Sequence, residues 1–301
     1  MINLVIKKKP SSKFVLIKVF IFTICISLLI KAAVSQATVV RSQEKKEKSN
    51  LFVQQISQMN SDNESLRLKN KNLRTSMKQN QILYREKLAN TKIAYLTFDD
   101  GPSNNTLEIL KILKKYNIKA TFFVNGHPEL GYLYKHISDD GHILANHTYS
   151  HEYKDVYTSA DNFKKDVSKL DAFLTNITGK EPNHILRYPG GSNNTVSQYY
   201  GGKGIMDTMI KETNKEGYIY FDWNVDSTDA SSYRQSKNKI VQAVLTESSR
   251  TKHPVVLMHD LNPKITTVQA LPEIIEGLKK KGFIFDVLSE NTYAPQFKVA
   301  T

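Results

Sequence analysis

Residues 93–102, IAYLTFDDGP, combine a short run of side chains typical of a buried β-strand with two adjacent carboxylates and a Gly-Pro turn. Packing alone does not explain a strand that ends in Asp99 and Asp100, because carboxylates are rarely buried without a partner. Further along the chain, short β-branched or aromatic runs alternate with segments of helical spacing. Residues 93–102 are therefore interpreted as the first of a series of strand–helix units.

Seven runs are predicted to be strands: 93–98, 120–124, 142–145, 184–187, 218–221, 255–258 and 283–287. Helical segments are predicted between them: 107–116, 160–176, 205–216, 240–249 and 268–280. This alternation indicates an α/β protein with a parallel sheet covered by helices, either open and doubly wound or closed into a barrel. No GxGxxG motif follows the first strand, which disfavours nucleotide binding.

Polar residues gather just past the ends of five predicted strands. They are Asp99 and Asp100, His147 and His151, Arg187, Asp226 and Asp229, and His259 and Asp260. The carboxyl ends of parallel barrel strands lie on one face, and such folds carry their active sites there. A single pair would be read as a turn cap or a surface charge, but five sets at equivalent positions predict a shared site.

The residue types in this group favour metal chemistry. His147 and His151 are four apart, so a helical turn between them would direct both imidazoles to one side. Two histidines and one carboxylate form a three-ligand site with open positions, suited to zinc or another divalent metal that lowers the pKa of a bound water. Side chains of neighbouring strand-end residues diverge, so one of Asp99 and Asp100 would bind metal while the other accepts a proton.

Five ordered segments carry a resemblance to a known family. They are residues 97–102 (TFDDGP), 147–151 (HTYSH), 187–190 (RYPG), 222–229 (DWNVDSTD) and 257–260 (LMHD). The chain resembles the NodB-type polysaccharide deacetylases, carbohydrate esterase family 4, over residues 92–288. The resemblance implies a distorted (β/α)7 barrel and metal-dependent removal of acetyl groups from N-acetylated sugars of a polysaccharide.

The resemblance also implies a role for each matched residue. Asp99 is expected to be the general base and His259 the general acid that protonates the leaving amine. A divalent metal ion is expected on Asp100, His147 and His151, with Zn²⁺ as the first choice and Co²⁺, Mn²⁺, Ni²⁺ or Fe²⁺ as alternatives. These roles match the needs of amide hydrolysis, which requires an activated water and a proton for a poor leaving group.

Four further residues complete the expected site. Arg187 would pair with Asp99, and Asp229 would orient His259. The backbone N–H of Gly190, together with the metal, would hold the oxyanion, and Leu257 would form the wall of the acetyl pocket.

The chain departs from the family pattern at two places. It has Gly190 where many members carry tyrosine, and Ala230 where many carry tryptophan. Both changes remove aromatic walls from the sugar groove and leave the preferred sugar open. Trp223, the only tryptophan, is expected either in the core at a strand end or as a substitute platform for the sugar.

Charge and cysteine content exclude other function classes. The 301-residue chain carries a net charge of +13, and residues 1–90 hold 17 of its 42 Lys and Arg but only 5 of its 29 Asp and Glu. Residues 91–301 are therefore close to neutral, at +1, and do not resemble a nucleic-acid-binding domain. Cys25 is the only cysteine, so disulfide scaffolds and thiol catalysis are excluded.

Residues 1–37 are predicted to be a basic cytoplasmic head followed by a signal anchor or a signal peptide. Four lysines within residues 7–13 precede an apolar run, and residues 14–34 would cross a bilayer if Lys18 and Lys31 reach the head groups. This reading places the domain outside the cytoplasm, anchored to the membrane. Small residues near Ala37 also fit a cleavage site, in which case the domain would be secreted.

Residues 38–90 are predicted to be a polar stalk between the membrane segment and a catalytic domain at 91–290, which a tail at 291–301 follows. A seven-residue repeat, with Ile56 at one core position and Leu66 at the other, suits a coiled coil that would join two copies in a homodimer. If helical, residues 41–90 would reach roughly 60 to 75 Å at about 1.5 Å per residue. A flexible linker fits the composition equally well.

The leading hypothesis is a deacetylase of N-acetylglucosamine residues in peptidoglycan. Alternative substrates are chitin-type polymers, poly-N-acetylglucosamine and acetylxylan. An iron oxygenase would also use two histidines and one carboxylate, but it would leave Asp99, Arg187 and His259 without a role. A non-catalytic glycan-binding protein would be expected to have lost ligands, and none of the matched ligands is missing.

Overall fold

The computed structural model describes the backbone of residues 12–299 and the side chains of these residues apart from 12–21 and 81–89. The chain divides into two compact units, Met1–Ile82 and Leu83–Thr301. The predicted basic head lies largely outside the described residues. The two units are described separately below.

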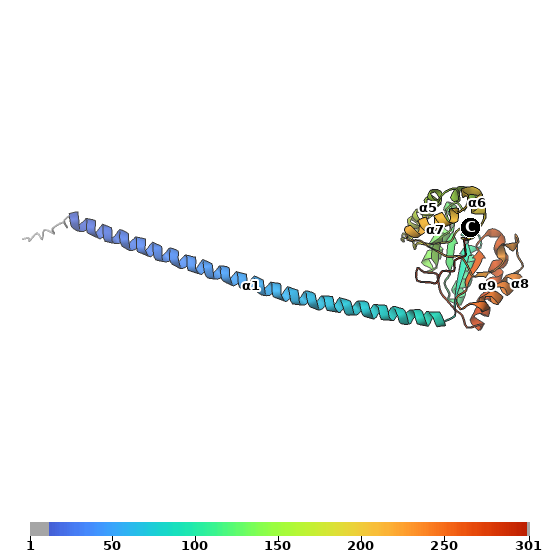
Figure 1. Cartoon of the computed structure of the whole chain (residues 1–301), viewed down its shortest axis with the longest axis horizontal. Helices are drawn as coiled ribbons and strands as arrows, with labels where there is room; N and C mark the ends of the chain where they lie inside the picture. The colour runs from blue at the N-terminus through green and yellow to red at the C-terminus, as the bar shows by residue number, and fades with distance from the viewer. Residues whose placement is uncertain (1–11, 300–301) are drawn as a thin grey trace, which may run out of the picture. The chain divides into compact units, whose positions relative to one another are not determined.

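The described part of the first unit is a single helix, α1 (Ser12–Asn90), whose last residues, from Leu83 on, are assigned to the second unit (Figure 1). Every described side chain from residue 22 to residue 80 is exposed. Within Phe22–Asn80 the helix contains a stretch long and apolar enough to cross a membrane. The predicted stalk, residues 38–90, lies within this helix, and its pairing into a coiled coil stays a prediction.

The second unit is built on a curled, wholly parallel sheet. Its strands are β1 (Ile93–Asp99), β2 (Thr121–Val124), β3 (Ile143–Asn146), β4 (Ile185–Leu186), β5 (Ile219–Tyr220), β6 (Val225–Asp226), β7 (Val255–His259) and β8 (Ile284–Phe285). The order across the sheet is β5-β4-β3-β2-β1-β7-β6, and β8 pairs with the start of β1. All strand pairs recorded among residues 12–299 are parallel.

The sheet corrects the sequence prediction in two respects. Strands β5 and β6 form its two ends and are not paired with each other in the described part of the chain, so the sheet is an incomplete barrel. Strand β6 was not predicted, and it places a strand between β5 and Asp229. The alternating pattern that reveals longer strands cannot appear in two residues.

Helices cover the outer face of the sheet. They are α2 (Thr106–Tyr116), α3 (Gly131–Asp139), α4 (Tyr153–Val156), α5 (Ala160–Thr178), α6 (Val196–Gly201), α7 (Ile205–Lys215), α8 (Lys237–Glu247) and α9 (Ile265–Lys280). Single 3₁₀ turns lie at η1 (Pro128–Leu130), η2 (Asp229–Ser231), η3 (Ser248–Arg250) and η4 (Asn262–Lys264). In Figure 1, α5, α6 and α7 gather on one side of this unit and α8 and α9 on the other.

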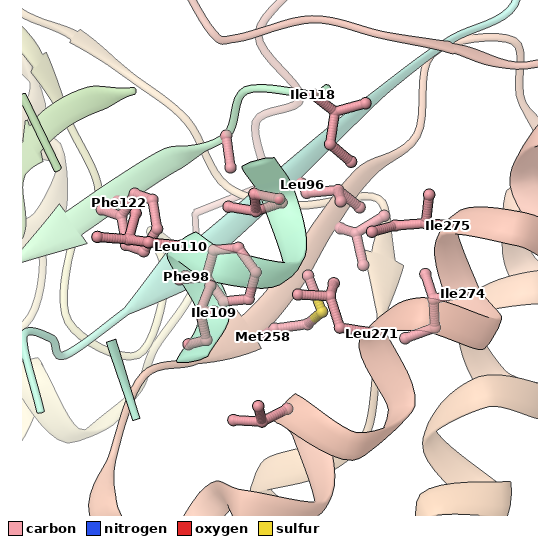
Figure 2. Close-up of a cluster of buried hydrophobic side chains, with 14 of the residues drawn as sticks. Leu96, Phe98, Ile109, Leu110, Ile118, Phe122, Met258, Leu271, Ile274 and Ile275 are labelled. Atoms are coloured by element: carbon pink, nitrogen blue, oxygen red, sulfur yellow. The ribbon is translucent and has the colours of Figure 1, made fainter. Parts of the chain in front are cut away.

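On strand β1, alternate side chains face the outer hydrophobic core and the inside of the curled sheet. Successive strand side chains point to opposite faces. Leu96 and Phe98 pack outward against α2 and α9, in a cluster that includes Ile109 and Leu271 (Figure 2). On the other face, Tyr95 belongs to an apolar cluster inside the curled sheet.

The inner face of the sheet becomes polar toward the carboxyl ends of the strands. On β1, Thr97 and Asp99 follow the apolar Ile93 and Tyr95 on the same face, and all four are buried. A buried carboxylate is costly unless it is paired. A charged partner for the Asp99 carboxylate is therefore expected on the inner face at this end of the sheet.

Candidate active site

The register of the sheet places the predicted residues side by side. Asp99 is the Cα partner of Phe123 on β2 and of His259 on β7. Asp100 follows with a left-handed backbone, φ 69°. The two neighbouring carboxylates both approach His147 Nε2, Asp99 through Oδ2 at 3.8 Å and Asp100 through Oδ1 at 3.4 Å, so they do not diverge fully as the sequence predicted.

Asp100, His147 and His151 form a cluster that could hold a metal ion. One ligand atom from each residue lies within 4.8 Å of the others. The Nε2 atoms of His147 and His151 lie 3.4 Å and 3.3 Å from Asp100 Oδ1. That oxygen is buried and has no hydrogen-bond partner among the described residues. An orphaned carboxylate oxygen facing two imidazole nitrogens suits a cation at their centre.

The tautomer of His147 also suits metal binding. Its Nδ1 lies 2.8 Å from the carbonyl oxygen of Arg187, an acceptor, so Nδ1 carries the proton. The lone pair of Nε2 then points toward Asp100 and is free for a cation. Backbone carbonyls commonly orient metal-binding histidines in this way.

The loop from His147 to His151 is not the helical turn that the four-residue spacing predicted. Thr148 and His151 have left-handed backbones, φ 69° and 55°, and the two imidazole centroids still lie 5.1 Å apart. Asn146 accepts a hydrogen bond from the Thr148 N–H, and Asp166 on α5 accepts from the Tyr149 and Ser150 N–H groups. Side chains, not helical hydrogen bonds, thus hold this loop.

Charges in the cluster depend on one another. Burial alone would raise the pKa of Asp100, but the adjacent imidazoles, above all that of His147, outweigh it and hold the pKa well below its usual range. Burial, followed by the nearby His147, lowers the pKa of His151. For His147, burial opposes the charged form, but the charges of Asp99 and Asp100 outweigh it and raise the pKa. Asp100 and His151 are thus held in their metal-binding forms, an ionised carboxylate and a neutral imidazole, whereas a cation would have to displace any proton on His147 Nε2.

Asp99 pairs with the buried guanidinium of Arg187. Arg187 Nη1 donates to Asp99 Oδ1 at 2.7 Å and to Thr97 Oγ1 at 2.8 Å. The other donors of Arg187 reach the carbonyl oxygens of Phe221 and Asp222, at 2.9 Å and 3.0 Å. The guanidinium therefore supplies the partner that the buried Asp99 carboxylate requires and links β1 to the segment after β5.

His259 is oriented by Asp229. Its Nδ1 lies 2.7 Å from Asp229 Oδ1, and its backbone N–H donates to Asp229 Oδ2 at 2.8 Å. Burial by itself lowers the pKa of His259, but the hydrogen bond and charge of Asp229 dominate and raise it to about 9. The imidazole is therefore protonated at neutral pH and able to donate a proton from Nε2.

The remaining predicted residues lie around this centre. Gly190 has φ 77° in the turn after β4, and its N–H donates to no group in the described part of the chain. Leu257 is buried on β7, two residues before His259. Trp223 is half-buried, and its ring meets that of Phe297 edge to face at 4.9 Å. Trp223 thus lies outside the buried clusters, and its role as a platform for the sugar stays a prediction.

Sequence reasoning missed Tyr153, at the start of α4. A Cβ atom on Gly190 would lie 2.4 Å from the Tyr153 hydroxyl oxygen. The ring of Tyr153 also packs edge to face against His151, with centroids 5.7 Å apart. Burial and the charge of Asp100 raise the pKa of Tyr153, so the hydroxyl stays protonated. An aromatic residue two positions after a predicted ligand was the available signal.

Two further buried charges stabilise the site, and sequence reasoning missed one of them, Lys264. Lys264 donates to the carbonyl oxygens of Asp229, Ser232 and Tyr233, which holds the loop that carries Asp229. Asp260, predicted at a strand end, accepts hydrogen bonds from Ser103 and Thr106 after β1, and burial raises its pKa to about 6. A lone lysine has no periodicity that distinguishes a buried residue from an exposed one.

The chain is similar to known deacetylases. A family model described as polysaccharide deacetylase matches residues 86–204. A peptidoglycan-N-acetylglucosamine deacetylase of Bacillus cereus is 33% identical over 213 residues, covering 68% of this chain and 72% of that protein. The peptidoglycan-N-acetylmuramic acid deacetylase PdaA of Bacillus subtilis is 31% identical, covering 70% and 76%. The crystal structure of the catalytic domain of a peptidoglycan N-acetylglucosamine deacetylase from Eubacterium rectale superposes with a TM-score of 0.67 at 37% identity, covering 70% and 94%.

Proposed function

The chain belongs to the polysaccharide deacetylase family, and from this premise we propose that it removes N-acetyl groups from N-acetylglucosamine residues of peptidoglycan. The observation that carries the proposal is the convergence at one end of the sheet of an arginine-paired carboxylate, an Asp-His-His cluster and a carboxylate-oriented histidine. Together these groups meet the requirements of amide hydrolysis.

Asp100, His147 and His151 would hold the metal ion, which we propose to be Zn²⁺. The orphaned Asp100 Oδ1 and the fixed tautomer of His147 support this donor set. Nitrogen and oxygen ligands suit zinc, although Co²⁺, Mn²⁺, Ni²⁺ and Fe²⁺ accept the same donors. A divalent ion at this place supplies Lewis acidity, which lowers the pKa of a water and polarises a carbonyl.

Asp99 accepts the proton of the attacking water. Its Oδ2 lies 3.8 Å from His147 Nε2, beside the cluster, while Oδ1 is occupied by Arg187. Arg187 is a positioning residue, because it fixes the carboxylate and balances its charge in a buried site. One oxygen of Asp99 thus remains for the proton.

His259 donates the proton that the leaving amine requires. Its Nδ1 is held by Asp229, so Nε2 is the donor, and the Asp229 charge keeps the imidazolium stable. Asp229 is in turn held by Thr267, which donates to Oδ2 at 2.9 Å. An amine leaves poorly as an anion, so general-acid assistance is essential to the reaction.

Gly190 and Leu257 contact the acetyl group on the substrate side. The unpartnered Gly190 N–H donates to the acyl oxygen as negative charge develops on it. Leu257 forms part of the apolar wall beside the acetyl methyl group.

Residues 1–37 act as a membrane anchor, and residues 38–90 separate the anchor from the catalytic domain at 91–290 and its tail at 291–301. The apolar stretch in α1 and the export-like charge pattern before it support this division. The enzyme then lies outside the cytoplasm, and paired stalks would form a homodimer. Cleavage near Ala37 would instead release it. Membrane fractionation of cells that express the tagged full chain separates these outcomes.

Acetate release tests the proposed activity. The full chain, loaded with Zn²⁺, should release acetate from peptidoglycan, should lose this activity with a chelator and should regain it when Zn²⁺ is restored. The exposed Asp207→Asn variant is a matched control and should behave as wild type. Chitin oligomers and acetylxylan in parallel reactions identify the substrate class. No acetate from any of these polymers, with any divalent metal, would refute the proposal.

A further inference from the structure

Tyr153 is held in place by aromatic contacts on two sides. Its ring meets the predicted ligand His151 at a centroid distance of 5.7 Å and the buried Tyr157 at 5.3 Å, both edge to face. Tyr157 is fixed in turn, because its hydroxyl donates to the carbonyl oxygen of Pro189 at 2.7 Å. The Tyr153 ring therefore packs between His151 of the candidate metal site and Tyr157, which is bound to the turn after β4.

The Tyr153 hydroxyl lies where the side chain of any residue other than glycine would begin at position 190. A Cβ atom on Gly190 would lie 2.4 Å from the hydroxyl oxygen and 3.4 Å from the ring carbon that carries it. Only glycine leaves this space free. The sequence predicted the loss of an aromatic wall at Gly190, and the structure places the hydroxyl end of an aromatic side chain from α4 against this glycine.

Two hydrogen-bond donors of this region have no protein acceptor. Within residues 12–299, neither the Gly190 N–H nor the Tyr153 hydroxyl donates to a protein group. The hydroxyl lies against the Cβ position of Gly190, and the Tyr153 ring contacts His151 of the candidate metal site. A pair of preorganised donors beside an electrophilic centre is the arrangement that stabilises a developing oxyanion.

We propose that Tyr153 contacts the substrate and that its hydroxyl donates a hydrogen bond to the acyl oxygen in the transition state, beside the Gly190 N–H. This inference rests on the proposed deacetylase function and deepens it. The donation matters most when the oxygen becomes negative, so Tyr153 contributes to turnover more than to substrate binding.

The first test is Tyr153→Phe in the full chain, which keeps the ring contacts and removes only the hydroxyl. We expect kcat to fall about 10- to 100-fold, somewhat less than for loss of a fully buried oxyanion donor. KM and bound zinc should change less than twofold. Tyr199→Phe, on the exposed ring of α6, is the matched control and should leave both constants unchanged.

A double-mutant cycle with Gly190→Ala tests the geometry. In wild type the added Cβ meets the hydroxyl oxygen, whereas Tyr153→Phe removes that oxygen. The cost of the positive φ at position 190 is present in both backgrounds and cancels. Gly190→Ala should therefore lower the thermal midpoint less in the Tyr153→Phe background than in wild type.

The outcomes separate this inference from the proposed function. If wild type releases no acetate, the proposed function fails. If wild type is active and Tyr153→Phe is equally active, only the role of Tyr153 is refuted. A raised KM at unchanged kcat would also refute it, since the hydroxyl would then bind the sugar and not the oxyanion. Equal midpoint losses in the two backgrounds would contradict the geometry.

Discussion

The centre and the two edges of the sheet are held together by different means. Strands β3, β2, β1 and β7 lie next to one another at the centre, have four to seven residues each and form continuous ladders. Asp99 and His259 end two of these strands, and Asp100 follows Asp99. Strands β4 and β5 at one edge and β6 at the other have only two residues each. At the edge formed by β4 and β5, the buried Arg187 side chain supplies connections that backbone ladders provide at the centre. The difference indicates that side-chain changes at the edges affect the site most strongly.

Loss of the Arg187 side chain should have the largest effect, at the edge formed by β4 and β5. Arg187→Met would leave Asp99 buried without its partner and would free the carbonyl oxygens of Phe221 and Asp222. We expect a loss of about 3–5 kcal/mol in the free energy of unfolding and a fall in kcat of about 10³-fold. Urea unfolding and acetate release measure the two effects. A fully stable and active variant would contradict the bridging role of the guanidinium.

The Asp229→Asn substitution should change the pH dependence of kcat, because Asp229 sets the pKa of His259. The catalytic form of His259 is protonated, so activity should persist below its pKa of about 9 and decline as pH rises through that value. In Asp229→Asn the pKa of His259 falls, because the raising hydrogen bond and charge are lost, and the alkaline limb should move to lower pH. At pH 7 we expect kcat to fall by about 10²-fold. A pH–kcat profile with an unmoved alkaline limb would exclude His259 as the acid.

The Asp222→Asn substitution should reduce stability and kcat less than the changes at Arg187 and Asp229. Its carboxylate accepts hydrogen bonds from the Ser192 N–H at 2.8 Å, from the Ser192 hydroxyl at 2.5 Å and from the Phe297 N–H at 2.7 Å. It thus ties the C-terminal tail to the loop that follows Gly190. Asp222→Asn should cost about 1–3 kcal/mol, and we expect kcat to fall by about tenfold through displacement of Gly190. Unchanged kcat together with reduced stability would show that the tail does not position this loop.

The smallest effect on turnover is expected at the centre of the sheet, where the ladders are continuous. Leu110→Ala opens a cavity between α2 and β1, behind the strand that carries Asp99. We expect a loss of about 2–5 kcal/mol in the free energy of unfolding, with kcat at 25 °C within twofold of wild type. The long ladders should keep the site in place while the core is weakened. A tenfold loss of kcat in the folded variant would mean that the centre and the edges depend equally on side chains.

The sequence predicted most of the site because its residues follow strand ends. Asp99, Asp100 and His259 adjoin runs whose β-forming side chains are easy to recognise, and parallel pairing brings those ends together. The longer helices were located by their apolar spacing. The family was predicted from motif order, and the relatives bear it out.

Other features have no signal in a single sequence. The left-handed backbones at Thr148 and His151 replaced a predicted helical turn, because hydrogen bonds from distant side chains decide that conformation. Strand β6 is too short for a periodic pattern. The contact of Tyr153 with Gly190 joins segments that are far apart in the chain, so it depends on the packing of α4 against the loop after β4.

The most direct test of the account compares zinc content and turnover in Asp99→Asn. The substitution keeps the shape of the side chain but removes its ability to accept the proton, while the Asp100, His147 and His151 cluster remains complete. We predict one bound zinc per chain, as in wild type, with a fall in kcat of about 10³-fold on peptidoglycan. Turnover at the wild-type rate, or loss of zinc in parallel with activity, would contradict the assignment of Asp99 as base and Asp100 as ligand.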